Sequence, residues 1–183
     1  MAGETVSVNG VLMSTNPPPS QDYVLGTGDV ELQRLGLQHR VWRPRALDAW
    51  RRAGFTLGQT LTDVGCGPGY AALDMAEIVG PTGRVLAADR SRRFLDALEE
   101  SARNRGLANV RTVQIDLSES SLPEAGADGA WCRWLLCFVP RPRDVIEQIV
   151  RAVRLGGAVV LHEYFDYGTW RFAPRCAELE EFV

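Results

Sequence analysis

The stretch Leu61–Tyr70, LTDVGCGPGY, carries a short apolar run into an acid and then three glycines within five residues. The apolar run predicts a buried strand. Gly65, Gly67 and Gly69 would let the backbone turn with positive φ, and they leave no Cβ beside a ligand. Residues 71–79 predict a helix whose free N-terminal amides face whatever lies over the glycines. A strand, a glycine-rich turn and a helix form the first unit of a nucleotide-binding α/β fold.

The spacing of the glycines separates two cofactor classes. The dinucleotide fingerprint Gly-x-Gly-x-x-Gly requires glycine at position 70, where this chain has Tyr70. Asp63–Gly69 reads Asp-x-Gly-x-Gly-x-Gly instead, and this pattern resembles motif I of the class I S-adenosylmethionine-dependent methyltransferases. The resemblance implies S-adenosylmethionine as cofactor, with Asp63 near the ammonium of its methionine part and the glycine turn, including Cys66, against that part. An ordinary tight turn without a ligand is the alternative.

A second acid follows the next expected strand. Residues 84–88 predict a strand that ends in Asp89, 26 positions after Asp63. A carboxylate at this place can accept both ribose hydroxyls of an adenosine, as in dinucleotide-binding folds. The alternative is a charge that favours the N-terminus of the following helix. We expect Asp89 and its neighbour Arg90 to contact the cofactor.

A third acid, Asp116, closes the strand expected at residues 110–115. The resemblance places the adenine amino group at Asp116 and a ring nitrogen at the backbone amide of Leu117. The alternative is that Asp116 caps a short helix after Ser118.

Arg133 interrupts the apolar run 130–139 and therefore needs a partner. The resemblance places it beside the carboxylate of the cofactor's methionine part. The next residue, Trp134, is predicted to belong to the core rather than to a substrate wall.

His162 and Glu163 lie at the end of the last expected strand and are the candidates for a general base. A structural histidine is the alternative. Methyl transfer from an activated sulfonium needs no base in many cases, because alignment and desolvation lower the barrier.

The chain divides into three parts. Residues 1–21, with a run of three prolines, predict a disordered or extended arm. Residues 22–55 predict a helical lid of two helices, one capped by Asp29 and one opened by Pro44. This segment resembles the lead-in of quinone-biosynthesis methyltransferases, which implies that Tyr23 and Gln38, together with Arg40, touch the cofactor.

Residues 56–183 predict a methyltransferase core of alternating strands and helices, a Rossmann-like doubly wound parallel sheet with strand order 3-2-1-4-5. A helix is expected at 142–153, and Gly156 and Gly157 then turn the chain into a fifth strand at 158–165. Strands 6 and 7 of the family are missing, so we expect a chain truncated after the fifth strand, with possible homo-oligomers through the lid or the uncovered sheet edge.

Composition bounds the function further. The 183 residues carry a net charge of −3, which argues against a nucleic-acid surface, and all 20 basic residues are arginine, which excludes lysine nucleophiles. No signal peptide or membrane span is recognisable, so a cytoplasmic protein is expected. The four cysteines and two histidines have no zinc-site spacing, which predicts buried thiols and no metal site. The cysteines are Cys66, Cys132, Cys137 and Cys176.

These observations predict an S-adenosylmethionine-dependent methyltransferase that acts on a small molecule. The alternatives are an NAD(P)-dependent oxidoreductase, which Tyr70 disfavours, and a non-catalytic module that binds S-adenosylmethionine. The acceptor lies beyond sequence-based inference, because one fold hosts many chemistries.

Overall fold

The computed structural model describes residues 26–123 and 126–166. The expected arm 1–21, Tyr23 and Cys176 lie outside these ranges. The elements follow in the order α1 (Asp29–Arg52), β1 (Thr60–Val64), α2 (Tyr70–Val79), β2 (Arg84–Asp89), α3 (Arg92–Asn104), β3 (Val110–Gln114), β4 (Ala127–Arg133), the 3-10 helix η1 (Leu136–Phe138), α4 (Pro142–Ala152) and β5 (Val153–His162).

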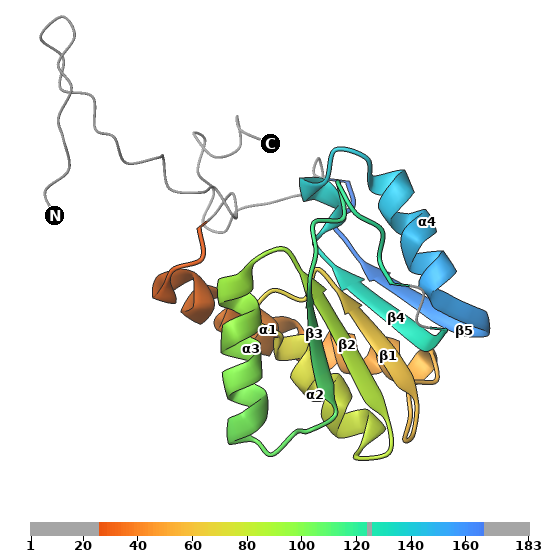
Figure 1. The fold of residues 1–183 in the computed structure, drawn as a ribbon, viewed down its shortest axis with the longest axis horizontal. Coiled ribbons are helices and arrows are strands. Elements are labelled where there is room, and N and C mark those ends of the chain that lie inside the picture. Colours follow the sequence, from red (N-terminus) through yellow and green to blue (C-terminus); the bar gives the residue numbers. More distant parts are fainter. Residues whose placement is uncertain (1–25, 124–125, 167–183) are drawn as a thin grey trace, which may run out of the picture.

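The strands form one parallel sheet in the order β3-β2-β1-β4-β5 (Figure 1), which confirms the predicted topology. On one face α1, α2 and α3 bury Trp50, Leu73 and Leu98 against the strands. On the other face α4 buries Val145 and Ile149. Because both faces carry helices, the inner strands β1, β2 and β4 are buried along most of their length. All carboxyl ends point to the same edge, where the glycine turn lies.

Helix α1 is one continuous helix, and the prediction of two helices was wrong. Pro44 lies inside it, and Gly28, not Asp29, occupies the N-cap. Pro44 removes one backbone hydrogen bond. The helix persists because residues on both sides of the proline, Gly36 and Trp50 among them, are buried against the rest of the domain. Tertiary packing thus outweighs the tendency of Pro44 to interrupt the helix.

Gly36 shows how closely α1 approaches α2. A Cβ at this position would lie 3.0 Å from the hydroxyl oxygen of Tyr70. That hydroxyl donates a hydrogen bond of 2.9 Å to the carbonyl oxygen of Leu32. Tyr70, which stands where a dinucleotide site has glycine, therefore holds helix α1.

The last strand also differs from its predicted bounds. Strand β5 begins at Val153, directly after α4, and ends at His162. Val153 pairs with Ala127 and Ala158 pairs with Gly129, so β5 accommodates extra residues there, with φ of 77° at Gly156. The glycines therefore shape an irregularity inside the strand and do not precede it.

Helix α4 buries Val145, Ile149 and Ala152, whereas Val150 on the same helix is exposed. Strand β4 ends at Arg133, and the residues after it form a turn and η1.

Candidate functional site

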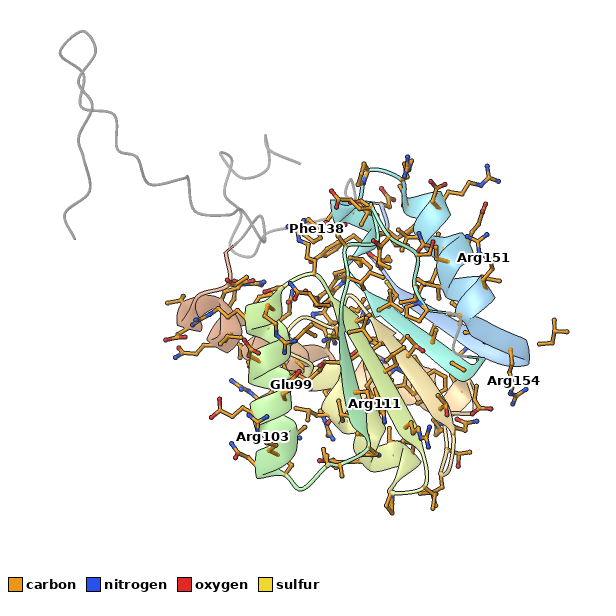
Figure 2. The ribbon with its side chains drawn as sticks, viewed as in Figure 1. Glu99, Arg103, Arg111, Phe138, Arg151 and Arg154 are labelled. Carbon is orange, nitrogen blue, oxygen red and sulfur yellow. The ribbon has the colours of Figure 1, made fainter. Side chains whose placement is uncertain are left out.

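A cavity lies over the glycine turn, at the carboxyl ends of the strands. Its walls come from α1, the turn, the ends of β2 and β3, the segment 133–140 and Tyr164. Phe138, labelled in Figure 2, is one of the lining residues and stands at this end of the molecule. The lining includes ten of the predicted contacts: Gln38, Asp63, Gly65, Cys66, Gly67, Asp89, Arg90, Asp116, Leu117 and Arg133. Among the described residues that were predicted to act in the site, four do not line this cavity: Gly69, Arg40, His162 and Glu163.

The three glycines of the turn have the predicted positive φ values, 69° at Gly65, 54° at Gly67 and 77° at Gly69. Their surroundings differ. A Cβ at Gly67 would meet no atom of the described residues within 4 Å, whereas one at Gly69 would lie 2.3 Å from Leu98 of α3. Gly67 therefore faces the cavity, whereas Gly69 allows the turn to pack closely against Leu98 of α3.

Asp63 is buried near the carboxyl end of β1. Its Oδ2 finds no hydrogen-bond partner among the described residues. Burial raises the pKa of Asp63 to about 7, and the charge of Asp89 adds to this, while Arg133 and the backbone N–H of Ala72 oppose it. A cation placed in the cavity would restore the ionised form.

Arg133 is the last residue of β4 and brings the opposite charge to the same cavity. Its Nη2 lies 3.1 Å from Nδ1 of His39, and its guanidinium carbon lies 4.9 Å from the ring centroid of Trp134. Its Nη1 is buried and has no partner within the described part of the chain. Burial lowers the pKa of Arg133, and the charge of Asp63 works against this effect.

Sequence reasoning missed His39 and Asp74, which complete this polar cluster. Nε2 of His39 lies 3.1 Å from Oδ2 of Asp74, and Nε of Arg43 donates to the same oxygen at 2.7 Å. Burial raises the pKa of Asp74, but the hydrogen bonds from His39 and Arg43 outweigh it, so the pKa is lowered. The available signal was an acid, Asp74, among the apolar residues of the expected helix 71–79, whose other acid is Glu77.

The two other acids also have backbone partners. Asp89 accepts hydrogen bonds of 2.8 Å from the N–H groups of Gly67 and Ser91, one on each oxygen. Burial raises the pKa of Asp89, and these two bonds oppose it. Asp116 accepts from the N–H and the hydroxyl of Ser118 on one oxygen, and these bonds lower its pKa. Asp116 therefore closes a turn at residues 117–119 and does not cap a helix, since no helix follows β3 in the described residues before β4, and it also lines the cavity.

The candidate bases have structural surroundings. His162 lies among the rings of Trp42, Trp131 and Trp134, and burial, followed by the charge of Arg133, lowers its pKa.

Glu163 holds the segment after β4. Its Oε1 accepts from the N–H groups of Leu135 at 3.0 Å and Leu136 at 3.2 Å. Trp134, expected in the core, instead lines the cavity with φ of 52° and stacks on Tyr164.

The thiols differ from one another in exposure. Cys132 is buried, as predicted, Cys66 is half-buried and Cys137 is exposed, which corrects the prediction for that residue. Burial, with the charges of Asp89 and Asp63, raises the pKa of Cys66. Within the ranges that the structure describes, no three His, Cys, Asp or Glu side chains form a possible metal site. None of the helices in those ranges is both long enough and apolar enough to cross a membrane.

Comparisons with known proteins agree with this geometry. The family model of a methyltransferase domain matches residues 62–161. A demethylmenaquinone methyltransferase of Geobacillus sp. (strain WCH70) is 31% identical over 126 residues, which cover 69% of this chain and 53% of the relative. The chain thus spans about half the length of the curated relatives it matches.

Solved structures share the fold. An S-adenosyl-L-methionine-dependent methyltransferase structure from Methanococcus maripaludis has a TM-score of 0.67 at 21% identity and covers 84% of this chain and 68% of its own. The [4+2]-cyclase SpnF has a TM-score of 0.59 at 26% identity, over 66% of this chain and 44% of its own. Because the methyltransferase-domain match extends over more than half of the sequence, this chain belongs to the class I S-adenosylmethionine-dependent methyltransferase family.

Proposed function

We propose that the chain binds S-adenosylmethionine in the cavity over the glycine turn and transfers its methyl group to a small molecule. The observation that carries the proposal is the pair Asp63 Oδ2 and Arg133 Nη1, two buried groups of opposite charge that lack partners among the described residues. A buried ionisable group without a partner is costly, so such a pair indicates a ligand. The ammonium and carboxylate of an amino acid match it.

In this proposal Asp63 accepts hydrogen bonds from the ammonium, and Arg133 donates to the carboxylate. The open space at Gly67 admits the backbone of the methionine part. Asp89 keeps lone pairs for the ribose hydroxyls beside its two backbone bonds. Asp116 and the amide of Leu117 line the cavity and are assigned to the adenine.

The cofactor, when bound, supplies a methyl group activated by its sulfonium. The residues of this chain then contribute binding, orientation and exclusion of water. Helix α1 contributes Arg34, Leu35 and Gln38 to the cavity wall, which supports its assignment as a lid. His162 and Glu163 are not needed as bases in this proposal, since both have other contacts.

The acceptor that we propose is a small aromatic ring of the quinol type, methylated on carbon. Support comes from curated relatives described as demethylmenaquinone methyltransferases and as a ubiquinone/menaquinone biosynthesis C-methyltransferase. Aromatic side chains line the same cavity, among them Trp134, Phe138 and Tyr164, and they suit a flat ring.

Calorimetry tests the cofactor part of the proposal. S-adenosylhomocysteine should bind the protein, NAD should not, and Arg133→Gln should weaken the binding at least about tenfold, because a hydrogen bond between charged groups is lost. Arg103→Gln, an exposed change on α3 (Figure 2), is the matched control and should bind as the parent does. Binding of NAD without S-adenosylhomocysteine would overturn the proposal.

Turnover tests the catalytic part of the proposal, the transfer of the methyl group. This test is needed because the fold alone does not establish methyl transfer: SpnF, a [4+2]-cyclase, shares it. Methyl transfer from labelled S-adenosylmethionine to a demethylated quinol is expected. A protein that binds the cofactor tightly and methylates no member of a panel of phenolic and quinol acceptors supports the non-catalytic alternative.

A further inference from the structure

A series of buried polar side chains connects helix α1, the proposed lid, to the cavity. It runs from Nη2 of Arg133 to Nδ1 of His39 at 3.1 Å, and from Nε2 of His39 to Oδ2 of Asp74 at 3.1 Å. The three residues belong to β4, α1 and α2. His39 and Asp74 are each 6% exposed. Polar groups so deeply buried are expected to hold fixed partners, because an unmade hydrogen bond is costly there.

The chemistry of the partners assigns a role to each ring nitrogen of His39. A guanidinium has donors and no acceptor, so in this contact Nδ1 of His39 accepts from Arg133. The carboxylate of Asp74 accepts, so Nε2 donates to it. Asp74, which also accepts from Arg43, thereby orients the ring.

This arrangement restrains Arg133 before any ligand arrives. His39 holds one terminal nitrogen, and the ring of Trp134 lies 4.9 Å from the guanidinium carbon. The other terminal nitrogen, Nη1, stays without a partner in the described ranges, and Arg133 lines the cavity. A long side chain that is already fixed loses little conformational entropy when it binds an anion.

We infer that His39 is a positioning residue, oriented by Asp74, that holds Arg133 ready for the carboxylate of the cofactor's amino acid part. The inference rests on the proposed function, since it assumes that this carboxylate meets Arg133. It assigns the lid helix a direct part in recognising one end of the cofactor. The adenosine end, near Asp89 and Asp116, is independent of this chain of contacts.

Two ligands separate a positioning role from a structural one. S-adenosylhomocysteine has the amino acid part, whereas 5′-methylthioadenosine has the adenosine and a thioether but no carboxylate. His39→Leu removes the hydrogen bonds, while His39→Asn keeps an acceptor near the place of Nδ1. In calorimetry, His39→Leu should bind S-adenosylhomocysteine at least about tenfold more weakly and 5′-methylthioadenosine unchanged, and His39→Asn should recover most of the loss.

Asp74→Leu removes the oxygen that accepts from His39 and Arg43, and it should also weaken S-adenosylhomocysteine selectively. Arg45→Leu, an exposed change on the same helix, is the matched control and should alter neither affinity. Equal weakening of both ligands in folded His39→Leu and Asp74→Leu, or unchanged affinity in both, would overturn the inference. If the parent protein binds neither ligand, the proposed function itself fails, which is a distinct result.

Discussion

The carboxyl of Asp63 is buried beside the glycine turn, and within the described residues its Oδ2 lacks a partner. Its ionisation therefore depends on what enters the cavity. Arg133 on the neighbouring strand moderates the effect of burial but does not cancel it, since the pKa still rises to about 7. A bound ammonium would favour the ionised carboxylate further. Ligand affinity and protonation of Asp63 are thus coupled.

The affinity for S-adenosylhomocysteine should increase with pH through neutrality. With a pKa of about 7 in the free protein, Asp63 is mostly protonated at pH 6 and mostly ionised at pH 7.5, and binding requires the ionised form. The dissociation constant should fall roughly eightfold over this interval, and binding at pH 6 should release a proton. Calorimetry in two buffers of different ionisation enthalpy measures both. Asp63→Asn should remove the dependence, and a pH-independent parent would contradict the assignment.

Asp89→Asn should destabilise the protein without any ligand. Its two oxygens each accept from a backbone N–H, so the amide would present its NH2 group to one of these donors. The free energy of unfolding in urea should fall by about 1 to 3 kcal/mol. Asp116→Asn is the control, because both of its bonds to Ser118 use one oxygen, which the amide keeps. An equal loss in the two variants would show that the backbone bonds are not the cause.

Several site residues could be predicted because each shows a local anomaly. Asp63 follows an apolar run before glycines, and Arg133 interrupts an apolar strand. His39 could not be predicted, since its partners Asp74 and Arg133 lie 35 and 94 positions away and meet it through the fold. Trp134 was assigned to the core, because its residue type does not reveal that its backbone has a positive φ of 52°.

At the scale of elements, α1 shows that tertiary packing can keep a helix continuous through a proline. Its proline lies in an exposed stretch, while burial on both sides keeps the helix in place. Local propensity predicted a break at this point. The contacts that prevent it, such as Tyr70 with Leu32, join residues far apart in sequence and leave no local signal.

Pro44→Ala should stabilise the protein. The substitution restores a backbone hydrogen bond in the helix interior and removes the clash of the ring, at an exposed position where little packing is lost. The free energy of unfolding should rise by about 1 to 3 kcal/mol, reduced somewhat by the greater freedom of the unfolded chain. Urea titration followed by circular dichroism measures this, with Arg45→Ala as the neutral control. A loss of stability would mean that α1 requires a bend at Pro44 to pack.

The glycine turn should respond differently at its two ends. Gly69→Ala places a Cβ 2.3 Å from Leu98 at a φ of 77°, so overpacking adds to backbone strain. Gly67→Ala meets no described atom, so strain of about 1 to 2 kcal/mol is its main cost. We expect Gly69→Ala to lose about 1 to 3 kcal/mol more stability, and Gly67→Ala to lose ligand affinity. Urea unfolding and calorimetry on both variants separate these effects, and identical profiles would contradict the division.

At the scale of the whole molecule, the alternation of strands and helices was sufficient to predict the sheet order, because right-handed crossovers leave few arrangements. The sheet order also predicts where a ligand would bind, since ligands of such folds lie where the strand order reverses. Element boundaries were less predictable. The start of β5 depends on its pairing with β4. Gly156 and Gly157, which suggested a turn, lie inside β5 where this pairing is irregular.

The outer edge of β5 leads to an expectation about association. Within the described ranges β5 pairs with β4 and with no other strand. Val159 is 37% exposed and Leu161 is 40% exposed on this strand. An apolar strand edge with unpaired backbone groups is a template for pairing with another chain. We therefore expect the protein to self-associate through β5.

Sedimentation velocity over a wide concentration range should show a rising average mass. Val159→Lys should suppress it, because a charge on an edge strand opposes pairing. Val30→Lys introduces the same charge on α1, where Val30 is 82% exposed, and should leave the association unchanged. If Val30→Lys suppresses it and Val159→Lys does not, helix α1 is the interface instead. A parent protein that sediments as a monomer at every concentration would show that the edge of β5 does not pair between chains.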